Sequence, residues 1–285
     1  METFVRRFPP AGPIRAVVLD WAGTAVDFGC MGPVAAFVQA FALHGVEVSL
    51  EEARSPMGKE KREHVRLMFG MSGVADRWKQ AHGEEPSSVD QEKVYADVEE
   101  LMVRSIENHA TPVPGLIPFV EALRRKNVAV GSCTGYTAPM MARLHPAAAR
   151  QGYAPDAVVC SSDVPAGRPQ PWMCYLNAMR LGIQPLETMV KIGDTIPDIQ
   201  EGLAAGMWTV GVTRTSSELG LTEKEVMALS VPERSARLRV VSARLAAAGA
   251  HYVVESVAEC LPVLEDINAR LARGESPAYA TYVQG

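Results

Sequence analysis

Val17-Val18-Leu19-Asp20-Trp21-Ala22-Gly23-Thr24 is a β-branched apolar run that ends in a carboxylate and a Gly-Thr turn. This pattern is typical of a buried parallel strand that carries an acid to the carboxyl edge of its sheet. Ligands bind at this edge in open α/β sheets. Asp20 can therefore bind a cation, attack an electrophile or merely cap the following loop. Other parts of the chain must supply the partners that distinguish these roles.

The composition fits a folded chain with a sizeable core. Of the 285 residues, 47% are hydrophobic and 21% are charged, which argues against disorder and allows one large α/β domain or a domain with an insert. The formal net charge of −5 disfavours nucleic-acid binding, which needs a basic face. A small anionic substrate is compatible with this charge, because a local site on an acidic protein can be basic.

Cysteine usage and the apolar runs predict a cytoplasmic protein without a membrane partner. The five cysteines are widely spaced and form no CxxC pair, so we expect reduced thiols rather than disulfides or a zinc site. Residues 1–10 contain no apolar core of a signal peptide, and no apolar run is long enough to span a bilayer.

Strand patterns stop after Asp20 and return near residue 111. In between, Ser49 and Glu52 form a capping box, and Pro56-Met57-Gly58 interrupts the helical pattern. From residue 111 on, strands and helices alternate, which predicts βαβ units and a parallel sheet. The helices expected in the interval span residues 32–44, 59–69, 74–82 and 88–107. We therefore expect an α/β fold, with a Rossmann-like core of residues 1–28 and 109–285 and a small all-helical cap of residues 29–108.

Four polar clusters lie at the ends of expected strands. In a parallel sheet these ends face one crevice, where two acids repel each other unless a cation lies between them. Mg²⁺ prefers oxygen ligands such as these carboxylates. A hydroxyl group and the planar guanidinium of an arginine can bind phosphoryl oxygens. Glycine lets backbone N–H groups approach an anion closely. Taken alone, a residue such as Thr134 is more often a turn residue, and one such as Arg168 is more often a surface charge. The clusters are Asp20-x-Ala22-Gly23-Thr24, Ser132-Cys133-Thr134-Gly135, Gly167-Arg168-Pro169 and Gly193-Asp194-Thr195-x-x-Asp198.

In this order the clusters resemble the motifs of the haloacid dehalogenase superfamily of aspartate-nucleophile phosphotransferases. Ordinary phosphatases of this superfamily carry a second Asp two residues after the nucleophile, and it protonates the leaving alkoxide. Ala22 occupies that position here, which indicates either a leaving group other than an alkoxide or a loss of function. The resemblance implies Asp20 as nucleophile, Thr134 and Arg168 as the second and third motifs, and Asp194 and Asp198 as the acidic fourth motif.

A lysine in the expected cap offers a different chemistry. In Pro56-Met57-Gly58-Lys59-Glu60-Lys61-Arg62-Glu63-His64 a Gly turn precedes a helix on which Lys61 and His64 share a face. A lysine held in a dry cleft loses its proton more easily and can form a Schiff base with an aldehyde or ketone. The alternative is an ordinary basic helix face, with Lys59 paired to Glu63 one turn later.

With Ala22 and this lysine together, the chain resembles the phosphonatases, the phosphonoacetaldehyde hydrolase family of the same superfamily. The resemblance runs from about residue 14 to about residue 270. It implies hydrolysis of the P–C bond of phosphonoacetaldehyde to acetaldehyde and phosphate, in 2-aminoethylphosphonate degradation, and it implies a homodimer. The alternatives are a Mg²⁺-dependent phosphomonoester phosphatase and a non-catalytic relative. The motifs that carry it lie in residues 20–24, 56–65, 134–137, 163–169 and 193–195.

The same resemblance implies the roles of the site residues. Lys61 forms the Schiff base and Asp20 the aspartyl-phosphate. His64, with an unperturbed pKa of ~6.5, is either a proton shuttle or a structural residue, and Cys30 and Tyr136 either line the cleft or pack in the core. The remaining roles are Mg²⁺ binding by Asp20, the Ala22 carbonyl and Asp194, support of the metal site by Asp198, and phosphoryl binding by Thr134, Gly135 and Arg168.

Overall fold

A six-stranded parallel sheet forms the centre of the molecule. The computed structural model describes residues 11–279, so the expectation about residues 1–10 lies outside the described residues. The strands lie in the order β3-β2-β1-β4-β5-β6, with β1 between β2 and β4. Their bounds are β1 (Ala16–Leu19), β2 (Ala129–Thr134), β3 (Ala157–Cys160), β4 (Met189–Gly193), β5 (Trp208–Val212) and β6 (Tyr252–Val254).

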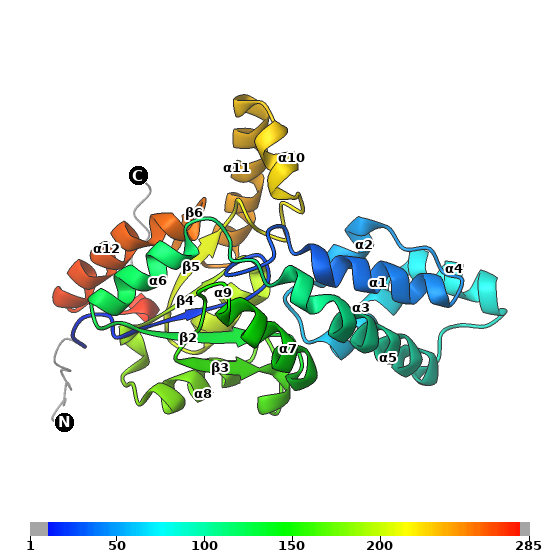
Figure 1. Cartoon of the computed structure of the whole chain (residues 1–285), viewed down its shortest axis with the longest axis horizontal. Coiled ribbons are helices and arrows are strands. Elements are labelled where there is room, and N and C mark those ends of the chain that lie inside the picture. The colour runs from blue at the N-terminus through cyan, green and yellow to red at the C-terminus, as the bar shows by residue number, and fades with distance from the viewer. Residues whose placement is uncertain (1–10, 280–285) are drawn as a thin grey trace, which may run out of the picture.

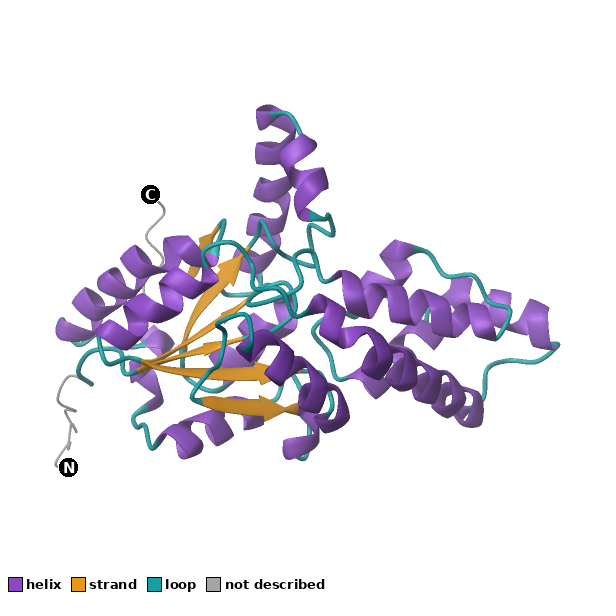
Figure 2. Cartoon of the chain, viewed as in Figure 1, coloured by secondary structure: helices purple, strands orange, loops and turns teal. Residues whose placement is uncertain are grey.

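Helices cover both faces of the sheet, as Figures 1 and 2 show. The residues of β1 are fully buried, because alternate side chains pack against opposite helical layers. One layer consists of α6 (Leu116–Arg125), α7 (Ala138–Ala149) and α12 (Cys260–Ala272), and the other of α8 (Trp172–Leu181), α9 (Ile196–Ala204) and α11 (Val231–Ala247). The short α10 (Glu223–Ala228) precedes α11, and this pair projects from the core in Figure 1.

A second, all-helical unit lies beyond the carboxyl ends of the strands, on the right of Figure 1. An aromatic cluster of Phe41, Phe69 and Trp78 packs inside it, with successive ring centroids 4.9 Å apart. This unit confirms the predicted cap on a Rossmann-like core, whereas the division at residues 28/29 and 108/109 stays a prediction. Its helices are α1 (Met31–Leu43), α2 (Leu50–Arg54), α3 (Lys61–Phe69), α4 (Ser72–His82) and α5 (Ser88–Ser105), followed by the 3₁₀ turn η1 (Ile106–His109).

The helix that carries the candidate lysine begins two residues later than the expected Lys59. Glu60 has an extended backbone, and its carboxylate accepts hydrogen bonds from the backbone N–H groups of Arg62 and Glu63, both at 3.0 Å. This side chain is a helix N-cap, so the first helical residue is Lys61. Lys59 therefore lies in the loop that leads into α3.

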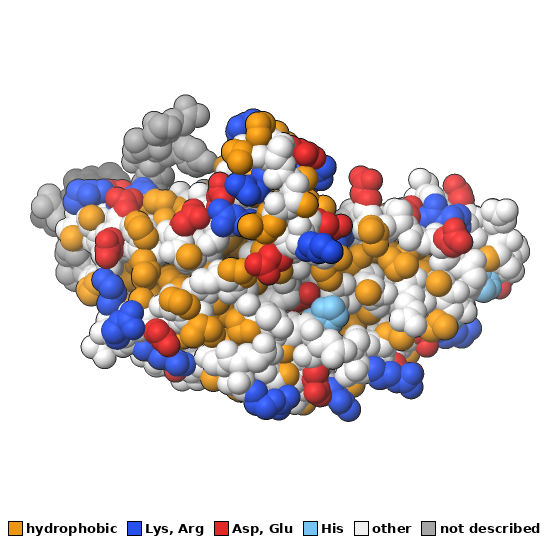
Figure 3. All heavy atoms as spheres, turned by 45° about the horizontal axis from the view of Figure 1, so that its top comes forward, with side chains coloured by type: hydrophobic (Ala, Val, Ile, Leu, Met, Phe, Trp, Pro, Cys, Tyr) orange, Lys and Arg blue, Asp and Glu red, His pale blue; other side chains and the backbone are white. Residues whose placement is uncertain are grey.

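The displayed surface carries both signs of charge. Figure 3 shows basic and acidic side chains interspersed over the visible face. No helix within residues 11–279 has both the length and the apolar character needed to cross a bilayer.

Candidate active site

Adjacent strand ends bring the predicted acids together. The Asp20 N–H donates to the Ile192 carbonyl (3.0 Å), which fixes Asp20 at the end of β1 beside β4. Asp194 follows β4 directly, and Asp198 lies in the first turn of α9. Carboxylate oxygens of these three buried acids lie within 4.8 Å of one another. The structure thus places the first and fourth predicted motifs in one cluster at the carboxyl edge of the sheet.

The three carboxylates of this cluster differ in how free their oxygens are to bind a cation. Asp198 already accepts hydrogen bonds from Lys191 Nζ and Thr195 Oγ1, each at 2.5 Å. Asp194 accepts from the Thr24 hydroxyl (3.0 Å) and from the backbone N–H of Ser217 (2.9 Å), which hold its carboxylate in place. Asp20 and Asp194 are therefore better placed than Asp198 to offer oxygens to a cation.

Burial makes the cluster unfavourable without a counter-charge. It raises the pKa of Asp20, with the charge of Asp198 as the next cause, and it raises the pKa of Asp194 well above its ordinary range, with Asp20 next. A divalent cation at these oxygens would relieve both effects. The donor set is all oxygen, so it fits Mg²⁺ better than a softer metal.

Arg168 lies inside the cluster, so the interpretation as a surface charge is wrong. Its side chain is 2% exposed. Nη2 donates to Asp20 Oδ1 (2.7 Å) and to the Cys133 carbonyl (2.9 Å), and Nε donates to Glu201 Oε2 (2.9 Å). Thr134 ends β2 beside it, and its hydroxyl oxygen accepts from the Tyr136 N–H (3.1 Å). This acceptance leaves the Thr134 O–H free to donate to a ligand.

The cap lysine is buried over the core. Lys61 is 3% exposed, and its Nζ lies 5.1 Å from the ring centroid of Tyr136 and 5.6 Å from that of Phe37. Burial is the main cause that lowers the pKa of Lys61 from its ordinary value. The alternative pairing of Lys59 with Glu63 is wrong, because Glu63 binds Arg66 (2.6 and 2.7 Å) and Lys59 lies before the helix.

His64 lies behind the lysine rather than at the cavity. Its Nε2 is 3.0 Å from the Ala53 carbonyl, so this nitrogen carries the proton, and its ring stacks on Phe37 with centroids 3.8 Å apart. Burial lowers the pKa of His64 well below its ordinary value, which keeps the ring neutral. Cys30 and Tyr136, by contrast, both line the cavity between Asp20 and Lys61.

This cavity is nearly closed by the contact between cap and core. Its volume is about 20 Å³, which is close to the space of one water molecule. A Cβ on Gly58 would overlap the Thr195 hydroxyl, and a Cβ on Gly135 would lie 2.6 Å from the Lys59 carbonyl oxygen. A pocket of about 580 Å³ between cap and core adjoins it, and Lys59 and Arg168 line both. In this conformation the cavity has too little room for a ligand much larger than water. The cavity is lined by Asp20, Ala22, Cys30, Pro33, Met57, Gly58, Lys59, Lys61, Thr134, Gly135, Tyr136, Arg168 and Thr195.

Two charged residues of the cluster, Lys191 and Glu201, lie outside the strand-end motifs predicted from the sequence. Lys191 lies within β4, and Glu201 lies one helical turn after Asp198 on α9; both side chains are completely buried. Burial raises the pKa of Glu201 to about 8, and Arg168 and Lys191 act in the opposite direction. In the sequence, Lys191 is a lone charge within an apolar strand, and Glu201 is one on the apolar face of a helix. A buried charge needs a partner, so this pattern could have indicated both residues.

Comparisons with known proteins identify the family of this chain. The haloacid dehalogenase-like hydrolase family matches residues 14–206. A phosphonoacetaldehyde hydrolase of Nitratidesulfovibrio vulgaris is 60% identical over 97% of this chain and 99% of its own length. A bifunctional phosphonoacetaldehyde hydrolase/aminoethylphosphonate transaminase of Clostridioides difficile is 46% identical over 89% of this chain, which matches 39% of that protein.

A solved structure extends the agreement to three dimensions. The crystal structure of a phosphonoacetaldehyde hydrolase-like protein from Oleispira antarctica superposes with a TM-score of 0.94 at 40% identity, over 97% of this chain and all of that chain. These matches confirm the resemblance predicted from the strand-end motifs and the cap lysine. The chain therefore belongs to the haloacid dehalogenase-like hydrolases and, within them, to the phosphonoacetaldehyde hydrolase family.

Proposed function

We propose that this protein hydrolyses the P–C bond of phosphonoacetaldehyde to acetaldehyde and phosphate. The observation that carries the proposal is the shared cavity: Lys61 from the cap and Asp20 from the core line one narrow space, with Ala22 where an ester phosphatase has its acid. The names of the relatives support the same substrate. The Clostridioides difficile relative is also named an aminoethylphosphonate transaminase, which supports a place for this protein in 2-aminoethylphosphonate degradation.

The lysine solves the problem of the leaving group. Breaking a P–C bond directly would expel a carbanion, which is a very poor leaving group. The Lys61 amine instead condenses with the substrate aldehyde, releases water and forms a protonated imine. Burial of the Lys61 side chain lowers its pKa and so favours the neutral amine. When the P–C bond breaks, its electron pair flows into the imine and leaves an enamine.

The core residues carry the phosphoryl transfer. An Asp20 carboxylate oxygen attacks phosphorus in line with the departing carbon and forms an aspartyl-phosphate. Arg168 and the Thr134 hydroxyl bind the phosphoryl oxygens, and the backbone at Gly135 approaches them closely. Water then cleaves the aspartyl-phosphate to phosphate, and the enamine takes up a proton and hydrolyses to acetaldehyde, which frees Lys61. No acid is needed at position 22.

Mg²⁺ fits the acidic cluster. We assign its binding to Asp20, Asp194 and the Ala22 carbonyl, with Asp198 as a supporting residue, because the oxygens of Asp198 are already held by Lys191 and Thr195. When bound, the cation neutralises charge on the phosphoryl oxygens. Its removal would leave the buried acids with Arg168 and Lys191 as their cationic partners.

We assign supporting roles to the residues around Lys61 and Asp20. Cys30 and Tyr136 shape the substrate cavity, which they line. His64 helps to position Lys61 by its stacking on Phe37, the ring that Lys61 Nζ also approaches. A homodimer and a reducing cytoplasmic setting belong to the proposal, the second because all five cysteines are free.

A substrate panel tests this function. Phosphate release and acetaldehyde formation are measured with phosphonoacetaldehyde and with a set of phosphomonoesters, each with Mg²⁺ and with a chelator. We expect equal amounts of both products from phosphonoacetaldehyde, only with Mg²⁺, and little release from the esters. Fast release from the esters with none from phosphonoacetaldehyde would favour the phosphomonoesterase alternative, which Ala22 disfavours.

A further inference from the structure

Arg168 is the cation closest to the proposed nucleophile, and its guanidinium is held at two of its three nitrogens. Nη2 binds Asp20 and the Cys133 carbonyl, and Nε binds Glu201. Nη1 makes no hydrogen bond to any of residues 11–279, and Arg168 lines both the closed cavity and the larger pocket between cap and core. Nη1 is therefore the nitrogen left to bind a ligand, and its direction depends on what holds Nε.

Glu201 is the residue that holds Nε. It lies three residues after Asp198 on α9, so the two acids share one helix face and reach the same guanidinium, at 2.9 Å for Glu201 and 3.1 Å for Asp198. A planar group that is bonded at both Nε and Nη2 cannot rotate about its last torsion. Without the bond to Glu201, Arg168 could turn and pair through two nitrogens with Asp20. Such a pair would engage the nucleophile and remove Nη1 from the cavity.

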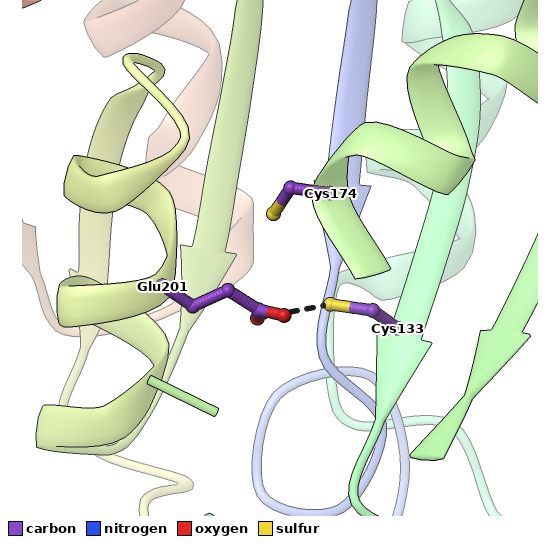
Figure 4. Close-up of side chains that lie close together, drawn as sticks. All are labelled: Cys133, Cys174 and Glu201. Atoms are coloured by element: carbon purple, nitrogen blue, oxygen red, sulfur yellow. Dashed lines mark hydrogen bonds between the residues drawn. The ribbon is translucent and has the colours of Figure 1, made fainter. Parts of the chain in front are cut away.

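The surroundings of Glu201 favour this role over simple packing. Figure 4 shows its side chain reaching from α9 toward Cys133, whose Sγ donates to Oε2 at 3.3 Å, with Cys174 beside them. Lys191 Nζ lies 3.8 Å from the same oxygen. The other oxygen, Oε1, is buried without a hydrogen-bond partner. The partners of Glu201 therefore all meet at Oε2, the oxygen that binds Arg168 Nε.

We infer that Glu201 is a positioning residue for phosphoryl transfer: it fixes the Arg168 guanidinium so that Nη1 faces the phosphoryl group while Nη2 stays on Asp20. The inference rests on the proposed function and adds a residue outside the strand-end motifs. The group of Cys133, Cys174 and Glu201 is poorly suited to a metal ion, because Arg168 and Lys191 would repel a cation there.

A double-mutant cycle tests this inference. Glu201→Gln replaces one carboxyl oxygen by an amide nitrogen, and Glu201→Asp keeps the carboxyl group but shortens its reach to Nε. Each change is made in the wild type and in Arg168→Lys, whose side chain has no Nε to hold. We expect each to lower kcat/KM roughly 10-fold or more in the wild type and less than about 2-fold in the Arg168→Lys background. Glu275→Gln, which removes a carboxylate bound to Arg270 and Arg273, is the matched control and should leave kcat/KM unchanged.

Inorganic phosphate provides a readout that does not depend on the substrate. Its affinity in the presence of Mg²⁺, measured by calorimetry, should fall in both Glu201 variants and not in Glu275→Gln. Equal losses of kcat/KM in the two backgrounds, or no loss in the wild type, would overturn the inference. If the wild type does not turn over phosphonoacetaldehyde but phosphate binding shows the expected coupling to Arg168, the positioning role stands and the proposed substrate is wrong.

Discussion

The contact of Gly58 with the core makes a quantitative prediction about cap closure. Gly58 has φ +87°, and an added Cβ would overlap the Thr195 hydroxyl and lie 3.0 Å from its Cβ. Thr195 cannot easily give way, because it caps α9 through Asp198. In Gly58→Ala the left-handed backbone costs about 1–2 kcal/mol whether the cap is open or closed. The overlap adds about 1–3 kcal/mol to the closed state alone, which corresponds to roughly a 5- to 150-fold loss of kcat/KM.

A matched control separates these two effects. Gly83 has φ +84° at the end of α4, with no other heavy atom within 4 Å of an added Cβ. Gly83→Ala should therefore lower Tm by a similar amount to Gly58→Ala and leave kcat/KM within about 2-fold of wild type. The assays are phosphate release for kcat/KM and thermal unfolding for Tm. If Gly58→Ala loses no more kcat/KM than Gly83→Ala, the closed contact between cap and core is not needed for turnover, and this reasoning is refuted.

Three further predictions follow from the same site. Ala22→Asp should abolish phosphate release from phosphonoacetaldehyde, because it adds a charge in the cavity beside Asp20; full turnover in this variant would remove the argument from position 22. Burial lowers the pKa of Lys61 from its ordinary value of 10.5. In a pH profile, kcat/KM should therefore rise with loss of the lysine proton at a pH below 10.5. A rise centred at pH 10.5 would contradict the burial of the amine. Mg²⁺ at about 100 times its Kd should raise Tm by about 5 °C in scanning fluorimetry, with a smaller rise in Asp194→Asn; equal rises would place the cation elsewhere.

The sequence predicts those parts of the fold that depend on local patterns. The apolar run before Asp20 predicts a buried parallel strand, which the structure confirms, and the capping box of Ser49 and Glu52 forms as expected. The start of α3 was placed two residues too early, because the N-cap here is Glu60 rather than one of the commoner capping residues Ser, Thr, Asn and Asp. A local pattern therefore predicts the presence of a helix or strand more reliably than the residue at which it begins.

The arrangement inside the site is less predictable, because it depends on tertiary contacts. Arg168 was expected to bind phosphoryl oxygens, but its pairing with Asp20 joins residues 148 positions apart. Glu201 and Lys191 have no motif of their own, and only their burial shows that they belong to the cluster. The closed contact of Gly58 with Thr195 joins two units whose relative placement no spacing in the sequence encodes.

Covalent trapping with borohydride shows whether Lys61 forms an imine with the substrate. The protein is incubated with phosphonoacetaldehyde and borohydride, which reduces an imine to a stable amine, and the modified residue is located by peptide mass spectrometry. We predict a single adduct on Lys61 that is lost in Lys61→Arg and retained in Lys59→Arg, the matched change two residues away. Equal trapping of wild type and Lys61→Arg, or an adduct on another lysine, would contradict the account.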